Sequence, residues 1–191
     1  RHELEKKMGV LKRRHPIDPA IRQFISWEEL RANTPPFVIP EREKINVEKH
    51  PNAELNLKAK RIIKGEIPFF SSEWIGLGKD YDWITNPDNG YRYDINKHWS
   101  EIPDFSPATG DIKYVWEKSR FTWLLAIIRS DYHHDEDHSG FVFDEIERWI
   151  NANPVNSGPN WRCSQEISLR ILNWCFALHF YKNSVALTEE R

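Results

Sequence analysis

The chain has 191 residues, of which 39% are hydrophobic and 29% are charged. These values are typical of a globular protein, and the sequence holds no apolar run long enough to cross a bilayer, so we expect no membrane span. The formal net charge of −2 lacks the basic excess that usually accompanies nucleic-acid binding, so we expect no nucleic-acid partner.

Residues 1–64 are predicted to form an N-terminal helical lead-in. Residues 1–14 and 18–32 have the spacing of short amphipathic helices, and Asp18-Pro19 at the start of the second suits the cap and first turn. A further helix is expected at about residues 52–64, where the apolar positions partly match the helical period.

Residues 65–110 are predicted to form a long irregular arm rich in aromatic residues. Pro, Gly, Asn and Asp interrupt every periodic pattern in this range, and Asn89-Gly90 predicts a tight hairpin turn. We expect most of the rings to be buried against a helical body, although a sugar-stacking platform is the alternative. The rings belong to Phe69, Phe70, Trp74, Tyr81, Trp83, Tyr91, Tyr93, Trp99 and Phe105.

Residues 111–191 have a strongly helical pattern, which predicts helices at about 111–131, 141–151 and 164–182. Connections between them are short, so the C-terminal part of the chain is expected to consist of helical hairpins. A further segment is expected after residue 182, with Thr188 as its possible cap.

Two of these helices carry a narrow polar stripe on an otherwise apolar surface. The first stripe consists of Lys113, Glu117 and Arg120, and the second of Glu166, Arg170 and Asn173. Charges on an enclosed helix must be paired or face water, because burying an isolated ion is costly. Two interpretations remain open: pairs within each helix, Glu117 with Arg120 and Glu166 with Arg170, or one wall of a water-filled cleft.

Four other residues are candidates for a ligand site. Asn160 and Trp161 precede the 164–182 helix, whose N-terminal N–H groups favour an anion. His98 and its neighbour Trp99 lie in the aromatic-rich arm, where His98 is either a substrate contact or a loop histidine satisfied by the backbone.

Four segments of the chain resemble the N-terminal domain of the heparinase II/III family of polysaccharide lyases. They read IPFFSSEWIGLGKDYDW, KHWSEIPDF, GDIKYVWEKSRFTWLLAI and WINANPVNSGPNWRCSQEISLRILNW, and the last is the most specific. The resemblance extends from about residue 60 to the end of the chain.

The resemblance implies an all-α fold, an incomplete (α/α) toroid of helical hairpins with a long aromatic-rich arm, followed by a C-terminal β-sandwich domain. It also implies eliminative cleavage of a uronic-acid-containing polysaccharide, similar to heparan sulfate, heparin or alginate, in the periplasm or outside the cell. The family's catalytic Asn, Tyr and His would lie beyond Arg191, so we expect no catalytic residue here. The implied groove residues are Arg120, Asn160, Trp161, Glu166 and Arg170, and guanidinium groups suit acidic sugars.

Two alternatives to a lyase remain open. One is a non-catalytic carbohydrate-binding or scaffold module, because the chain lacks a complete acid–base set. The other is a glycoside hydrolase on an (α/α) barrel, which requires two carboxylates on opposite sides of a sugar, and Glu117 with Glu166 is the pair to consider.

The segment DYHHDEDHSG, residues 131–140, combines three His with acidic residues. A divalent metal is conceivable there, but a polar turn between helices has the same composition. We therefore expect neither a metal nor a cofactor in this chain.

Overall fold

The computed structural model describes residues 2–20, 26, 29, 32, 33, 37, 38 and 41–187. Most of the helix expected at 18–32, and Thr188 with the segment that it would cap, lie outside these residues. The helix expected at 1–14 is two helices, α1 (His2–Lys7) and α2 (Val10–Arg14), because Gly9 between them adopts a φ of 66°. A residue with positive φ cannot continue a right-handed helix.

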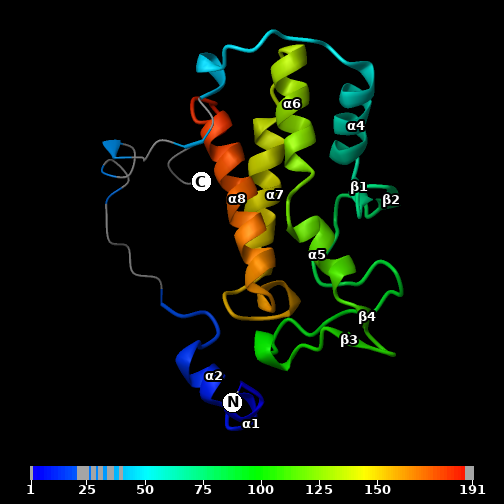
Figure 1. The fold of residues 1–191 in the computed structure, drawn as a ribbon, viewed down its shortest axis with the longest axis vertical. Helices are drawn as coiled ribbons and strands as arrows, with labels where there is room; N and C mark the ends of the chain where they lie inside the picture. The colour runs from blue at the N-terminus through cyan, green and yellow to red at the C-terminus, as the bar shows by residue number, and fades with distance from the viewer. Residues whose placement is uncertain are drawn as a thin grey trace.

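Four longer helices lie side by side along the molecule in Figure 1. They are α4 (Ala53–Ile63), α6 (Leu124–His134), α7 (Ser139–Ala152) and α8 (Ser164–Phe180). The side chain of Asn52 caps α4 by accepting a hydrogen bond of 3.0 Å from the Leu55 main-chain N–H. The helices predicted at 52–64, 141–151 and 164–182 are thereby confirmed.

The helix predicted at 111–131 is broken. It consists of α5 (Lys113–Ser119) and α6, separated by Phe121 at a φ of 58°. The Phe121 ring is fully buried and stacks on Trp83 at a centroid distance of 5.5 Å. The helix prediction was therefore wrong at this point. The buried apolar residues Phe121, Trp123 and Leu124 continue the apolar pattern through the break, so the pattern did not reveal it.

The aromatic-rich arm contains strands that the sequence analysis missed. Strand β1 (Glu66–Phe69) pairs antiparallel with β2 (Glu73–Gly76), and β3 (Phe105–Ser106) pairs with β4 (Gly110–Asp111). Burial alternates along β1, with Ile67 and Phe69 facing the core. Four residues that include Pro68 are too few to reveal that alternation.

The predicted all-α fold, an incomplete (α/α) toroid, is therefore wrong. The structure is 47% helical, and the residues that it describes also include two small antiparallel sheets, so the protein is a small mixed α/β domain. None of the described helices combines the length and the apolar composition that crossing a bilayer requires.

Rings of the arm fill the space between the sheets and the helices. Four of the nine rings are buried: Phe69, Tyr81, Trp83 and Tyr93. Trp74 and Trp99 are half-buried, whereas Phe70, Tyr91 and Phe105 are exposed, so burial was predicted correctly for some of these rings only. The turn predicted at Asn89-Gly90 is present: Gly90 has a φ of 74°, and a β-bridge joins Thr85 to Arg92. Three 3-10 helices complete the described fold: η1 (Arg42–Lys44), η2 (Trp99–Glu101) and η3 (Pro159–Trp161).

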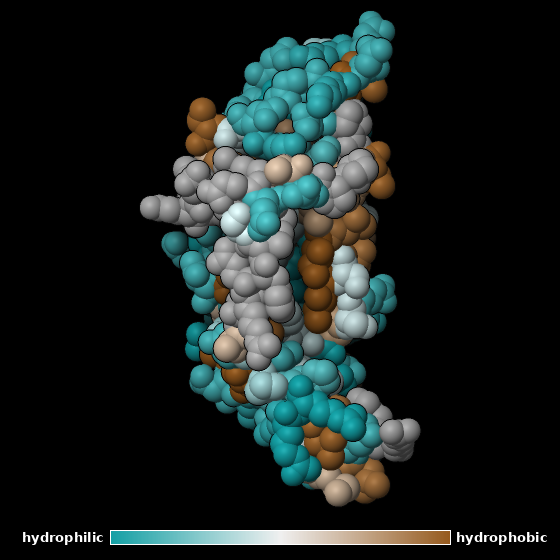
Figure 2. All heavy atoms as spheres, turned by 90° about the vertical axis from the view of Figure 1, so that its left-hand side faces the viewer, coloured by the Kyte–Doolittle hydropathy of each residue, from teal (hydrophilic) through white to brown (hydrophobic). Residues whose placement is uncertain are grey.

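One side of the helical layer leaves apolar side chains exposed. Helix α8 lies on the left of the layer in Figure 1, and its residues Ile171, Leu172 and Leu178 are 51%, 46% and 42% exposed. Figure 2 views the molecule from this side and shows apolar surface in the middle of the face, with hydrophilic surface gathered above it.

Gly65 provides a test of the junction between α4 and β1. It has a φ of 92°, and an added Cβ would lie 2.6 Å from the carbonyl carbon of Gly78. Gly65→Ala should therefore lower the free energy of unfolding by about 2–3 kcal/mol, measured by urea denaturation. The matched control is Gly140→Ala, which introduces no contact on α7 and should raise stability by about 0.5 kcal/mol. Equal effects of the two substitutions would contradict this description of the junction.

Candidate functional site

Arg170 lies at the centre of the contacts that join α5, α8 and the turn before α8. Its side chain is 2% exposed, Nε donates to the Ser119 carbonyl at 2.8 Å, and Nη2 donates to the Asn160 carbonyl at 2.9 Å. The guanidinium also lies over the Trp149 ring, 3.9 Å from its centroid. Burial lowers the pKa of Arg170 to about 9, so the group keeps its charge at neutral pH.

The turn that Arg170 holds contains two of the predicted site residues. Asn160 is fully buried, and its Nδ2 donates to the Trp83 carbonyl at 2.9 Å and to Asn153 Oδ1 at 2.8 Å. The half-buried Trp161 donates its Nε1–H to the Asn153 carbonyl at 3.2 Å. Both side chains therefore fix the path of the chain into α8.

Arg120 forms a cluster with Glu117 and Glu166, which we call the Arg120 cluster. Nε and Nη2 of Arg120 both donate to the Glu166 carboxylate, and Nη1 donates to Glu117. The Arg120 side chain is 19% exposed, whereas those of the two glutamates are 8% and 5% exposed. Three of its five N–H donors are used, and the cluster has a net charge of −1.

The contacts support paired charges as the interpretation of the polar stripes, but most of the pairs differ from those expected. The pair of Glu117 with Arg120 exists as expected. Glu166, however, pairs with Arg120 across the helices, and Arg170 uses main-chain carbonyls as its partners. Asn173 adds another hydrogen bond between α8 and the end of α5, because its Nδ2 donates to the Arg120 carbonyl at 2.8 Å. Glu117, Arg120, Glu166, Arg170 and Asn173 therefore belong to one paired network between α5 and α8. Lys113 lies outside it, because its side chain is exposed and lies 3.8 Å from Asp111.

The tip of the β1–β2 hairpin presents an aromatic ring beside this cluster. The main-chain N–H of Phe70 donates to Glu117 Oε2 at 3.2 Å, and the Phe70 ring is 43% exposed. The rings of Phe70 and Tyr114 pack edge-to-face, with a centroid distance of 5.0 Å and an interplanar angle of 89°. We call Phe70 and Tyr114 the aromatic rim.

The backbone of the hairpin tip is strained. Phe70 and Ser71 have φ values of 46° and 69°, a region that costs a non-glycine residue about 1–2 kcal/mol. Phe70 is one of several aromatic residues of the arm, and its sequence context does not single it out, because PFFSSEW lacks the Gly or Asn typical of such a turn.

Acidic groups surround the aromatic rim. The pKa of the Tyr114 hydroxyl is raised, and the largest cause is repulsion between the phenolate and the Asp88 carboxylate. Burial and the charges of Glu73 and Asp111 contribute less. With the net negative Arg120 cluster beside it, the rim favours a ligand with hydroxyl groups to donate over a bare anion. The arrangement suits stacking against a sugar ring and hydrogen bonding to its hydroxyls.

His98 and Trp99 lie apart from the Arg120 cluster. His98 is 2% exposed; the Ser100 main-chain N–H donates to its Nδ1 at 3.2 Å, so Nε2 carries the proton that is shared with the His15 carbonyl at 2.8 Å. The Trp99 main-chain N–H donates to the Asn156 carbonyl at 3.0 Å. These contacts attach η2 to the N-terminal segment and to the loop after α7, and no described contact joins either residue to Arg120 or Arg170.

The segment 131–140 brings Asp131, Glu136 and His138 together, with potential ligand atoms within 4.8 Å of one another. The carboxylate of the fully buried Asp131 is engaged by protein groups, because Tyr181 donates its hydroxyl to Oδ2 at 2.6 Å and His138 Nδ1 lies 2.6 Å from Oδ1. Nη2 of Arg42 donates to the carbonyls of Asp131 and Glu136, which places a positive charge beside the group. These contacts favour a structural role, in which the turn between α6 and α7 is fixed.

Comparisons of the chain with protein-family models, with curated proteins and with solved structures find no significant match.

Because Arg170 is buried and hydrogen-bonded, we expect its substitution to destabilise the protein strongly. Arg170→Met would leave the Ser119 and Asn160 carbonyls without their donors, so the free energy of unfolding should fall by about 3 kcal/mol in urea denaturation. The exposed Arg129 on α6 is the matched control, and Arg129→Met should change stability by less than about 0.5 kcal/mol. A loss for Arg170→Met no larger than for the control would contradict the role given to this guanidinium.

Proposed function

We propose that this chain is the N-terminal part of a polysaccharide lyase of the heparinase II/III type, in which it supports the sugar chain while other residues break it. The observation that carries the proposal is the exposed ring of Phe70, held in a strained backbone beside the Arg120 cluster. Strain of this kind persists where the surrounding contacts impose it, and it is frequent at ligand sites. The four sequence segments that resemble the family support the same function.

The chemistry of elimination indicates that this chain would support the substrate and would not carry out the reaction. Removal of the proton next to a uronate carboxylate requires a base within reach of that proton and a donor that neutralises the carboxylate. Arg120 already faces two carboxylates and Arg170 is buried, so neither is available as that donor. We infer that the catalytic residues, and the groups that recognise the uronate, belong to other parts of the protein, including a β-sandwich domain.

The substrate would be an acidic polysaccharide in the periplasm or outside the cell. The aromatic rim would stack on the apolar face of a sugar ring, and the glutamates of the Arg120 cluster would accept hydrogen bonds from its hydroxyls.

A non-catalytic carbohydrate-binding module is the second candidate. The complete pairing of the Arg120 cluster favours it, because such a network provides rigidity without a free acid or base. A glycoside hydrolase has less support, since Glu117 and Glu166 both bind the same guanidinium instead of flanking a space for a sugar.

The lyase is tested by incubating the full-length protein that contains this chain with heparan sulfate, heparin and alginate. The expected result is ultraviolet absorbance from the double bond that elimination creates beside the carboxylate. New reducing ends without that absorbance would indicate the hydrolase, and binding without either product would indicate the carbohydrate-binding module.

Phe70 provides a more local prediction. In Phe70→Asn the ring is lost while the left-handed backbone is retained, because Asn tolerates that conformation. Covering the exposed part of the ring is worth about 1 kcal/mol, so the KM for the polysaccharide should rise about fivefold while the unfolding midpoint changes little.

The matched control for this prediction is Phe105→Asn. Phe105 is an aromatic residue on β3 that is 69% exposed, and its replacement should leave KM unchanged. A KM that is the same in wild type and Phe70→Asn would remove the aromatic rim from the proposed site.

A further inference from the structure

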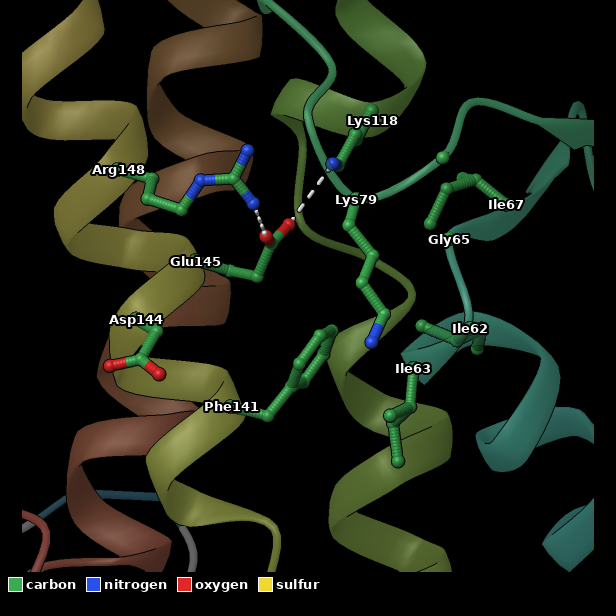
Figure 3. A pocket seen from close by; sticks show the side chains of 11 residues that line it. Ile62, Ile63, Gly65, Ile67, Lys79, Lys118, Phe141, Asp144, Glu145 and Arg148 are labelled. Carbon is green, nitrogen blue, oxygen red and sulfur yellow. Dashed lines mark hydrogen bonds and ion pairs between the residues drawn. The ribbon is translucent and has the colours of Figure 1, made fainter.

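A cleft opens between α7 and the junction of α4 with β1, and its volume is about 210 Å³ (Figure 3). The apolar wall has two facing parts, Phe141 on α7 and the residues Ile62, Ile63 and Ile67 on the α4–β1 side. At about 30 Å³ per water molecule, the space equals roughly seven waters, which is the size of a compact organic molecule. None of the Arg120 cluster lines this cleft, so it is separate from the site described above.

A buried ion pair closes one end of the cleft. Lys118 Nζ lies 3.0 Å from Glu145 Oε2, and the two side chains are 3% and 6% exposed. The ammonium of Lys118 also lies 4.2 Å from the centroid of the Trp83 ring. Arg148 Nη1 donates to the other oxygen of Glu145 at 2.6 Å, so this carboxylate faces two cations.

Lys79 differs from these residues because it has no ion-pair partner among the described carboxylates. It is exposed, and Figure 3 shows its side chain extending into the cleft between Phe141 and Ile63. The ionisable residues that line the cleft are Lys79, Lys118 and Arg148 against Asp144 and Glu145, which gives a net charge of +1.

The charges and the wall together define the chemistry of an occupant. At the closed end of the cleft, Glu145 is already paired with Lys118 and with Arg148, so this carboxylate is not free to hold a cationic ligand. A single negative charge would match the net charge of the lining, and an apolar body would cover the isoleucines and the ring of Phe141.

We propose that this cleft binds a small organic carboxylate with an apolar body, whose carboxylate pairs with Lys79 while its body lies against Ile63 and Phe141. The site is independent of the proposed lyase function. A phosphate group is a poorer match, because it carries more charge than the lining balances and leaves the apolar wall uncovered.

The test is a calorimetric titration of the full-length protein with benzoate, with benzyl alcohol as the neutral analogue and inorganic phosphate as the anion without an apolar body. Benzoate should bind at least tenfold more tightly than either comparison compound. Lys79→Gln should weaken benzoate binding about tenfold, and Ile63→Ala should weaken it severalfold. Lys97→Gln, at an exposed lysine outside the cleft, should leave the affinity unchanged.

Several outcomes would overturn the proposal. Equal binding of benzyl alcohol would make the cleft a plain apolar cavity, and equal binding of phosphate would make it a general basic surface. Failure of benzoate to bind, or the same affinity in Lys79→Gln and Lys97→Gln, would remove the site altogether. The exposed positions of Lys79 and Lys97 keep both substitutions compatible with folding.

Discussion

The buried guanidinium of Arg170 is the constraint on which the packing of the C-terminal half depends. A charge in the interior is tolerated only when hydrogen bonds replace its water, and here the replacements come from main-chain carbonyls of Ser119 and Asn160. Those carbonyls belong to the end of α5 and to the turn before α8. Any shift of one element would leave a polar group unsatisfied, so α5, η3 and α8 are fixed relative to one another.

This constraint also positions the Arg120 cluster. Arg120 follows Ser119 directly, and Glu166 lies one helical turn before Arg170, so the contacts of Arg170 bring Arg120 and Glu166 together. Glu117 then accepts the Phe70 N–H and connects the hairpin tip to the same network. The position of an exposed ring is therefore set by charges that lie mostly inside the protein, and this is how a strained turn persists without Gly or Asn.

The sequence predicted the features that depend on local pattern. The helices at 52–64 and 164–182 and the close spacing of Glu166, Arg170 and Asn173 follow from residues a few positions apart. The partners of Arg170 could not be predicted, because one of them lies 51 residues away and both are main-chain groups. The break at Phe121 was also hidden, since its positive φ is imposed by ring contacts with Trp83, far away in the chain.

Arg120, Arg170 and Lys79 show that exposure and neighbouring charge, and not the presence of a cation alone, decide whether a side chain can hold an anion. Arg170 is enclosed, so a uronate could not reach it, and the Arg120 cluster has a net charge of −1, which would repel a uronate. Lys79 has an exposed ammonium in a cleft of net positive charge. In the proposed lyase, the charge of the substrate must therefore be balanced by groups other than the two arginines, and this site contributes affinity through ring contact and through hydrogen bonds to the sugar hydroxyls.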